Sequence, residues 1–575
     1  MCMHSRRSKL RRWWQTLPGA WHIWLALGLG CIVLPAQLSS AATPSVVAEI
    51  RDESVRRSSD PAGRPLPLAG HWNMGNYAGG EGFSPAYQVN LISLGHHILP
   101  WLMFPDYRDV NNPGYSYYEA AVKQFAAWNL PISLVGTQWE SILSDPGERF
   151  FSLPADQNPN VVDLSGHVLP KVDPFGPIEH WQTVGSMWTT SLLIKQLQTW
   201  YPSPPLVLFL SNNEHPKLLW REAETSRNFV RLYGIGTTSD TFRRKVFGDA
   251  WIERYRALIL GMRSTLGSSQ WQTNSVFIGY DAFGPQNFGR WAGWQDSLFA
   301  AGRISPWPYA WNGTSSSYYT NNWDPSTDYR VWSPQIESMN WVFMQRQVTR
   351  DVPNFWFEMS VWDGNVPVPT AYKNKRTVYE ELGQQYGPER YEGFVQYGMW
   401  LLTPRIVREF RGWTEKVSDC GMYFDAILRA VDRVYADPIL TKFWRSGTLV
   451  PNHTRLHPYQ VDIPTEYTSE DRWFLLNTDL NPPGSWSLTT ELPVMALARV
   501  IGQSNQREWL IYAHAPVGPR NQVQVEIPDY KKIVLDVPVA GAFYYVRESD
   551  GTLRRIGATG SDTIPPKMPM NLRVN

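Results

Sequence analysis

The sequence predicts a (β/α)8 barrel followed by a C-terminal all-β sandwich, and three observations lead to this fold class. First, eight short apolar runs alternate with segments of helical spacing over residues 66–455. Second, residues 456–575 change to short strands separated by turns. Third, 43% of the 575 residues are hydrophobic and 18% are charged, which is enough apolar material for a large core. A doubly wound parallel sheet is the alternative for the first region.

The first 42 residues have the pattern of a secretory signal peptide. Five basic residues and no acidic residue accompany an apolar run from Trp21 to Leu34, and small residues follow from Ser39 to Ala42. We therefore expect an exported protein, periplasmic, at the cell surface or secreted, with cleavage near Ala41 or Ala42. The apolar run is shorter than the roughly 20 residues that a spanning helix needs, so we expect no membrane span.

Residues 43–65 are polar and rich in proline, serine and arginine, which indicates a linker. The barrel is then expected over residues 66–455. Segments with helical spacing include Met187–Trp200 and residues 424–435. The eight predicted strands are Leu68–Met74, His97–Phe104, Leu130–Gly136, Leu206–Ser211, Ser275–Tyr280, Trp307–Trp311, Phe355–Val361 and Phe394–Leu402.

The C-terminal region has the two-residue period of half-buried strands. Val523, Val525 and Ile527 alternate with polar residues, and the turn 549–551 separates two further apolar runs. The predicted strands there are Arg507–His514, Gln522–Ile527, Lys532–Val537 and Gly541–Glu548. We find no motif in this region that would carry chemistry of its own.

Composition and missing motifs exclude several classes of protein. A net charge of +1 lacks the basic excess of nucleic-acid-binding proteins. The sequence has no HExxH or CxxC, P-loop, G-x-S-x-G or Gly-rich dinucleotide loop, so we expect neither a metal nor a cofactor. The 29 tryptophans suit either a large aromatic core or a cleft for sugars, because sugars present flat apolar faces with polar edges.

A carboxylate follows the fourth predicted strand. The buried run Leu206–Ser211 ends in Asn212, Asn213 and Glu214. In a barrel, the carboxyl ends of the strands form the face where catalytic residues lie. The alternative is a helix N-terminus, with an asparagine as cap and Glu214 in the first turn.

A second carboxylate lies inside the seventh predicted strand. Glu358 stands among aromatic and aliphatic neighbours in the stretch 354–362. An ionised carboxylate buried without a partner costs several kcal/mol, so such a residue is paired or functional. The alternative to a catalytic role is a salt bridge with Arg405 or Arg408.

Together the two acids indicate glycoside hydrolysis. That reaction needs one carboxyl group to protonate the leaving oxygen and a second to act at the developing oxocarbenium centre. A separation of about 5–5.5 Å between the carboxyl groups gives a retaining enzyme, and about 6.5–9.5 Å gives an inverting one.

In these residues the chain resembles clan A of the glycoside hydrolases. Members of that clan are (β/α)8 barrels with an Asn-Glu acid/base after strand four and a glutamate nucleophile at strand seven. Asn213-Glu214 and Glu358 match this pattern in type, order and strand number. The resemblance implies that Glu214 is the general acid/base, that Glu358 is the nucleophile of a double displacement, and that Asn213 binds the 2-hydroxyl of the sugar.

Further polar and aromatic residues at predicted strand ends are candidates for substrate binding. Each of them is also explained by packing, and Tyr280 and Arg405 are the candidates for keeping the nucleophile ionised. The set is His71, Trp101, Tyr280, Trp311, Trp362 and Arg405.

The sequence thus predicts an exported glycoside hydrolase that acts on a poly- or oligosaccharide, with a retaining double displacement. The alternative is a non-catalytic carbohydrate-binding protein on a barrel scaffold. A lyase or another barrel enzyme is the remaining option.

Overall fold

The computed structural model describes most of Thr43–Asn575, and the segment 1–42, with its predicted leader, lies outside the described residues. In this part of the chain, no helix combines the length and apolar character needed to cross a bilayer. The described residues are 43–56, 63–69, 84–104, 118–136, 147, 149–211, 220–236, 239–281, 311–319, 339, 342–343, 346, 354–360, 387–410, 417–451, 474–480, 494–516 and 518–557.

The stretch predicted as a linker contains a helix, α1 (Ser45–Arg56). Val46, Val47 and Ile50 are at most 3% exposed and belong to the main hydrophobic core. Their spacing places them on one face of the helix, while the polar residues between them gave the segment its linker-like composition. The linker interpretation of 43–65 is therefore wrong for most of its length.

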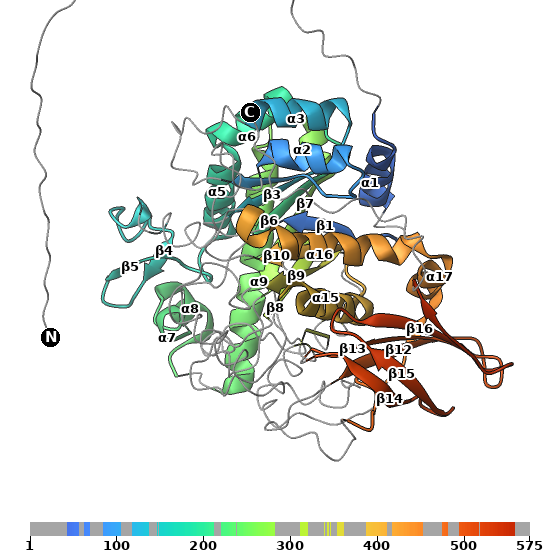
Figure 1. Ribbon diagram of the computed structural model, residues 1–575. Coiled ribbons are helices and arrows are strands. Elements are labelled where there is room, and N and C mark those ends of the chain that lie inside the picture. The colour runs from blue at the N-terminus through green and yellow to red at the C-terminus, as the bar shows by residue number, and fades with distance from the viewer. Residues whose placement is uncertain are drawn as a thin grey trace, which may run out of the picture. The chain divides into compact units, whose positions relative to one another are not determined.

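Eight strands form one parallel sheet, called the barrel sheet below (Figure 1). Its order is β1-β10-β9-β8-β7-β6-β3-β2, so from β2 onward each strand of this sheet neighbours the next one along the chain, and the first strand pairs with the last. This is the strand order of a (β/α)8 barrel, with β1 and β2 as the two ends of the hydrogen-bonded ladder. A doubly wound sheet would reverse its order at a central point, which excludes that alternative. The strands are β1 (Leu66–Ala69), β2 (Trp101–Phe104), β3 (Ile132–Gly136), β6 (Val207–Ser211), β7 (Ser275–Asp281), β8 (Gly313–Tyr319), β9 (Asn354–Ser360) and β10 (Ile406–Phe410).

Six of the eight predicted strands overlap these elements, and two predictions are wrong. The sixth strand is β8, which begins after the predicted run Trp307–Trp311 has ended. The run Phe394–Leu402, predicted as the eighth strand, belongs to helix α15 (Pro388–Leu402), and the eighth strand is β10. Every residue from Arg390 to Leu402 is buried, and a helix buried all round lacks the polar stripe that reveals helical spacing.

Side chains alternate between the inside of the barrel sheet and the surrounding helices. On β6, Leu208 and Leu210 belong to the interior cluster, whereas Val207 and Phe209 belong to the core under the helices. Phe209 stacks on Phe277 of β7 on that outer face, with 5.0 Å between ring centroids. The interior cluster consists of Leu99, Trp101, Leu206, Leu208, Leu210, Ile278 and Ile406.

Helices cover the outer face of the barrel sheet. The predicted helical segment 187–200 is divided between α5 and α6, because Ser191 caps the second helix through the backbone N–H of Ile194. The segment 424–435 is helical, as predicted. The helices between and after the strands are α2 (Pro85–Ser93), α3 (Tyr118–Ala127), α5 (Ile178–Thr189), α6 (Leu192–Trp200), α9 (Asp240–Ser264), α10 (Ser269–Asn274), α16 (Val417–Ala436) and α17 (Pro438–Ser446).

Helices α5 and α9 touch backbone to backbone through two glycines. A Cβ on Gly185 would lie 2.0 Å from the carbonyl oxygen of Leu258, and one on Gly261 would lie 1.9 Å from that of Gln182. With 25 residues, α9 is about 37 Å long, whereas the seven-residue strand β7 that follows spans only about 23 Å. Since α9 runs back toward the amino end of β7, its first turns extend beyond the carboxyl ends of the strands.

A buried ionic cluster lies beside the two ends of the strand ladder. Asp432 of α16 pairs with Arg64, which precedes β1, and its carboxylate lies 3.7 Å from His96 and 3.5 Å from His97, which precede β2. His97 also contacts Glu49 of α1. Burial alone raises the pKa of Asp432, but the imidazoles and the Arg64 charge outweigh burial and hold that pKa below its usual range. The cluster therefore links the segments that lead into β1 and β2.

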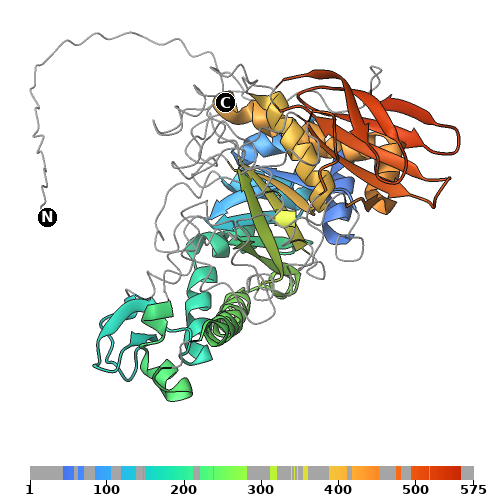
Figure 2. The same cartoon turned by 90° about the horizontal axis from the view of Figure 1, so that it is seen from below.

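The C-terminal strands form two antiparallel layers, a larger sheet and a hairpin, around a common core. The larger sheet packs on α15 (Figures 1 and 2). Val523 and Leu535 from the hairpin pack with Ile511 and Val546 from the larger sheet. The predicted boundary at 455/456 is too late, because β11 already pairs with β12 at residues 448–449. The larger sheet contains β11 (Thr448–Leu449), β12 (Met495–Ile501), β13 (Glu508–His514), β16 (Ala542–Arg547) and β17 (Thr552–Ile556), and the hairpin contains β14 (Arg520–Glu526) and β15 (Lys532–Val537).

Candidate active site

The carboxyl ends of the eight parallel strands mark the face for the candidate site. Strand β6, the fourth of the barrel sheet, ends at Ser211, so Asn213 and Glu214 come two and three residues after its end. Their structure lies outside the described residues. His71 and Trp362 also lie outside them, so these four candidates remain predictions from the sequence.

Glu358 is the fifth of the seven residues of β9, the seventh strand of the barrel sheet. For β9 the structure describes the main chain. The register places Glu358 between Ser317 of β8 and Arg408 of β10. The strand number predicted for this carboxylate is therefore correct, and its immediate neighbour across the sheet is a basic residue.

Arg408 is a buried cation, with 1% of its surface exposed. It lies two residues after Ile406, which belongs to the interior cluster, and Val407 between them belongs to the core under the helices. Alternation along a strand therefore assigns Arg408 to the interior face of the sheet. The sequence suggests Arg405 for the site and Arg408 only as an ion-pair partner, because the predicted eighth strand, Phe394–Leu402, ends before β10 begins.

Arg405 lies at the opposite end of the strand from the candidate site. It precedes the first residue of β10, is 7% exposed, and its guanidinium donates a hydrogen bond to the carbonyl of Ser54 at the end of α1. Its predicted substrate-binding role is therefore wrong. Arg405 fastens α1 to the amino-terminal end of the barrel sheet.

Trp101 and Trp311 are packing residues, which corrects two further predictions. Trp101, the first residue of β2, is fully buried in the interior cluster, and its main chain exchanges two hydrogen bonds of 2.7 Å with the Gln88 side chain. Trp311 precedes β8, is 6% exposed, and lies 5.2 Å from the ring of Tyr255. Both indoles lie at the amino ends of strands, at the opposite end of the barrel sheet from the candidate face.

Tyr280 takes a position near the carboxyl end of β7, next to Ser315 of β8. For this residue the structure describes the main chain. It lies two residues after Ile278 of the interior cluster. Its predicted place at the candidate face agrees with this position, while its contact with substrate remains a prediction.

Many of the described aromatic residues form a continuous core cluster. Ring contacts of 5.1–6.0 Å join Phe175 to Phe229 and Tyr233, and contacts of 5.2–5.8 Å continue along α9 to Trp311. The three tryptophans on this path, Trp220, Trp251 and Trp311, therefore serve packing. The members along this path are Phe175, Phe229, Tyr233, Trp220, Phe247, Trp251, Tyr255 and Trp311.

A small subdomain follows strands β3 and β6, and sequence reasoning missed it. Its hairpin, β4 (Asn160–Val162) and β5 (Val168–Val172), lies beside the helices α7 (Trp220–Ala223) and α8 (Arg227–Tyr233) in Figures 1 and 2. Lys171 pairs with Glu222 at 2.7 Å, and Arg227 donates a hydrogen bond of 2.9 Å to the carbonyl of Asp163. We call these elements the β4–α8 subdomain. They lie within the insertions that follow the third and fourth barrel strands, β3 and β6. In the sequence, Asn213 and Glu214 belong to the start of the second insertion.

Asp173 joins the two halves of this subdomain. Its carboxylate accepts hydrogen bonds from the backbone N–H of Phe175 at 2.8 Å and from the Asn228 side chain at 3.0 Å. Burial raises the pKa of Asp173 to about 6, although these hydrogen bonds act in the opposite direction.

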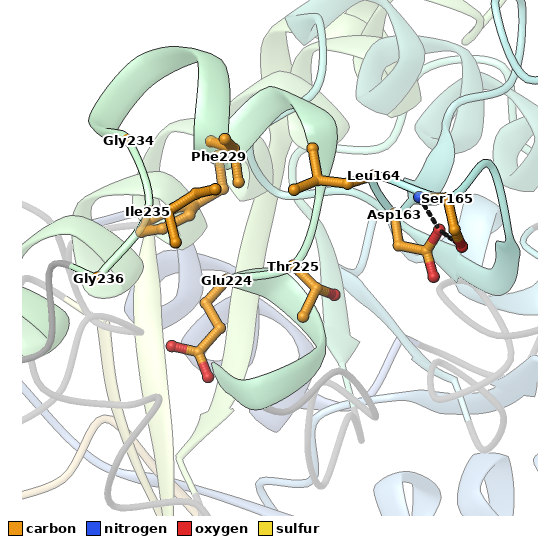
Figure 3. Close-up of a pocket in the computed structure, with 10 residues that line it drawn as sticks. Asp163, Leu164, Ser165, Glu224, Thr225, Phe229, Gly234, Ile235 and Gly236 are labelled. Atoms are coloured by element: carbon orange, nitrogen blue, oxygen red, sulfur yellow. Dashed lines mark hydrogen bonds between the residues drawn. The ribbon is translucent and has the colours of Figure 1, made fainter.

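The β4–α8 subdomain also contains a pocket of about 390 Å³ (Figure 3). The turn of the hairpin forms one wall, the turn between α7 and α8 a second, and the loop after α8 a third. The sequence feature that could have indicated this pocket is Gly234-Ile235-Gly236, a large aliphatic residue between two glycines. The lining residues are Asp163, Leu164, Ser165, Glu224, Thr225, Phe229, Val230, Gly234, Ile235 and Gly236.

No protein-family model and no curated protein matches the chain. Among solved structures it is similar to a modular endo-β-1,4-mannanase of glycoside hydrolase family 26 from Cellulomonas fimi, at 9% identity over 90% of this chain and 97% of the other, with a TM-score of 0.32. It is also similar to an endo-β-1,4-mannanase from Thermotoga petrophila, at 10% identity over 88% and 92%, with a TM-score of 0.32. A Bacteroidetes-affiliated cellulase of glycoside hydrolase family 5 gives 9% identity over 69% and 97%, with a TM-score of 0.33. The fold described above is assigned from the chain's own strand order and register.

Proposed function

We propose that this chain is an exported glycoside hydrolase that cleaves O-glycosidic bonds of a poly- or oligosaccharide by a retaining double displacement. The observation that carries the proposal is the register of Glu358 beside the buried Arg408 on the seventh and eighth strands. The Asn213-Glu214 pair after the fourth strand supplies the second carboxylate.

The register supports an ionised carboxylate on the interior side of the barrel sheet. Neighbouring positions of two paired strands share a face, and Arg408 shares the parity of Ile406, which belongs to the interior cluster. A positive charge within a few ångströms favours the ionised form of a carboxylate. A nucleophile needs that form, so Arg408 takes the stabilising role that the sequence suggested for Arg405.

In the proposed reaction, the Glu358 carboxylate attacks the anomeric carbon while Glu214 donates its proton to the leaving oxygen. The C–O bond to the leaving group breaks, and a covalent glycosyl–enzyme ester forms. Glu214 then takes a proton from water, whose oxygen attacks the same carbon and releases Glu358. Asn213 would bind the 2-hydroxyl, and Tyr280 would lie beside the nucleophile.

The remaining parts of the proposal concern export and the C-terminal region. The basic and apolar pattern of residues 1–42 supports a cleaved leader. The shared core of the two C-terminal layers supports a β-sandwich. Its hydrogen bonds to α15 support a bracing role for this sandwich.

The test is release of reducing sugar from a panel of polysaccharides by the wild type and by Glu214→Ala and Glu358→Ala. We expect each variant to lose on the order of 10³-fold or more in rate. Glu253→Ala, an exposed glutamate on α9 with a 60% exposed side chain, is the matched control and should retain activity. Azide should restore turnover to Glu358→Ala and yield a glycosyl azide, because a small anion can occupy the place of the missing nucleophile.

Near-normal turnover by either alanine variant would disprove the assigned roles. Polysaccharide binding by the wild type without any sugar release would instead favour the non-catalytic carbohydrate-binding alternative.

A further inference from the structure

Two strongly exposed aliphatic side chains line the pocket of the β4–α8 subdomain. Leu164 is 57% exposed and Ile235 is 80% exposed (Figure 3). The flanking glycines Gly234 and Gly236 have φ angles of 80° and 90°, which ordinary residues rarely adopt. Exposed aliphatic side chains concentrated in a concave site indicate a surface that binds a ligand.

Hydrogen-bonding groups lie beside these side chains. Within the described residues, the Glu224 carboxylate has neither a hydrogen-bond nor an ion-pair partner, and the hydroxyl of Thr225, also in the lining, donates a hydrogen bond of 2.8 Å to the carbonyl of Glu222. Asp163 accepts hydrogen bonds from Ser165 and from the backbone N–H of His167, and these hydrogen bonds, that of the Ser165 side chain foremost, lower the pKa of Asp163. The pocket therefore combines an aliphatic surface with carboxylates that accept hydrogen bonds and carry negative charge.

The position of the pocket connects it to the candidate active site. One wall comes from the insertion after the third barrel strand, and the other two come from the segment that begins six residues after Glu214. The long helix α9, which starts just after the third wall, extends beyond the carboxyl ends of the strands. The pocket thus lies in insertions after the carboxyl ends of the strands, the face to which the proposed function assigns Glu214 and Glu358.

We propose that this pocket is a distal subsite that holds an uncharged sugar unit of the glycan chain whose bond the enzyme cleaves. This inference rests on the proposed function. A sugar ring can pack its C–H face on Leu164 and Ile235 while its hydroxyl groups donate hydrogen bonds to Glu224. The carboxylates disfavour uronic acids and sulfated sugars by like-charge repulsion. The volume of about 390 Å³ lies within the range of small-molecule sites.

The experiment measures binding without turnover. All proteins carry Glu358→Gln, and their affinity for soluble glucomannan, mixed-linkage β-glucan, xylan and polygalacturonate is measured by affinity electrophoresis and calorimetry. We expect Leu164→Asp and Ile235→Asp each to weaken binding of one neutral polysaccharide at least tenfold. Leu260→Asp, which changes a 54% exposed leucine on α9 outside the pocket, is the control and should bind as the parent does. Circular dichroism checks that each variant is folded.

Unchanged affinity in both pocket variants would overturn the proposal, even if the chain hydrolyses glycans. Preferential binding of polygalacturonate, or equal losses in the Leu260→Asp control, would overturn it as well. If the pocket variants lose affinity for a neutral chain that the wild type never cleaves, the subsite stands as a glycan-binding site and the proposed hydrolase activity fails.

Discussion

Arg499 of β12 donates two hydrogen bonds, of 3.0 and 2.8 Å, to the main-chain carbonyl of Trp400 near the end of α15. The last carbonyls of a helix have no partner within the helix and lie at the negative end of its dipole. Burial lowers the pKa of Arg499 to about 10, so the guanidinium stays charged at neutral pH. One buried cation thereby joins the C-terminal sheet to the helix between the seventh and eighth barrel strands.

The first prediction is that Arg499→Met destabilises the whole protein. The substitution keeps the apolar stem but removes this donor from the buried carbonyl of Trp400 and the partly buried carbonyl of Gly447. We expect the free energy of unfolding to fall by about 3 kcal/mol in chemical denaturation. Arg547→Met removes an exposed pair with Asp550 and should leave the midpoint unchanged. Equal effects of the two substitutions would contradict the bracing role of the C-terminal sheet.

A second prediction concerns the contact between α5 and α9. Alanine in place of Gly185 or Gly261 would put its Cβ about 2 Å from a backbone carbonyl oxygen of the other helix. We expect a loss of about 2–3 kcal/mol from overpacking, although alanine favours helices by about 1 kcal/mol over glycine. Scanning calorimetry measures the loss. Gly267→Ala, whose Cβ would lie 3.7 Å from the nearest atom, should not lower the melting temperature.

The third prediction is a pH dependence due to Asp173. Because its pKa is raised to about 6, the unfolded chain releases this proton from about pH 4, while the folded chain holds it to about pH 6. Ionisation of Asp173 therefore lowers stability as the pH rises through that window, by about 3 kcal/mol in total. Asp173→Asn lacks this penalty. Its unfolding free energy relative to the wild type should rise between about pH 4 and 7, and a pH-independent difference would exclude the effect.

A fourth prediction tests the pairing of Arg408 with Glu358. Without the positive charge, the carboxylate holds its proton to higher pH, so Arg408→Met should shift the acid limb of the kcat/KM profile upward. Arg408→Lys keeps the charge and should leave that limb close to the wild-type position. A profile that falls in height for both variants, without any movement of the limb, would indicate that Arg408 has only a structural role.

The parallel α/β architecture could be predicted from the sequence because most barrel strands carry their own local signal. Strands such as β6 are apolar on both faces, so they read as continuous runs. Strand β8 reads Gly-Thr-Ser-Ser-Ser-Tyr-Tyr and has no such run, which is why its place was assigned to Trp311 and the residues before it. The segment of α15 is wrongly predicted as a strand for the opposite reason: it is an apolar run, because the C-terminal sheet buries the face that would otherwise be polar.

The candidate site was predictable where it depends on position along a strand, as for Glu358. It was not predictable where a shift of three positions along the chain decides whether a residue belongs to the site. Arg405 falls before the first residue of β10 and contacts α1, whereas Arg408 falls inside the strand next to Glu358. The pocket of the β4–α8 subdomain depends on segments separated by some 60 residues, which no local pattern brings together.

The cluster around Asp432 has a consequence for the order of events during synthesis. Arg64 and Asp432 are separated by 368 positions along the chain, so Arg64 leaves the ribosome long before the buried carboxylate of Asp432 exists, and the more exposed Glu49 of α1 is the acid beside it until then. A guanidinium cannot be buried without a counter-charge except at a cost of several kcal/mol. The native burial of Arg64 against Asp432 can therefore form only after α16 has been translated, late in the elongation of the chain.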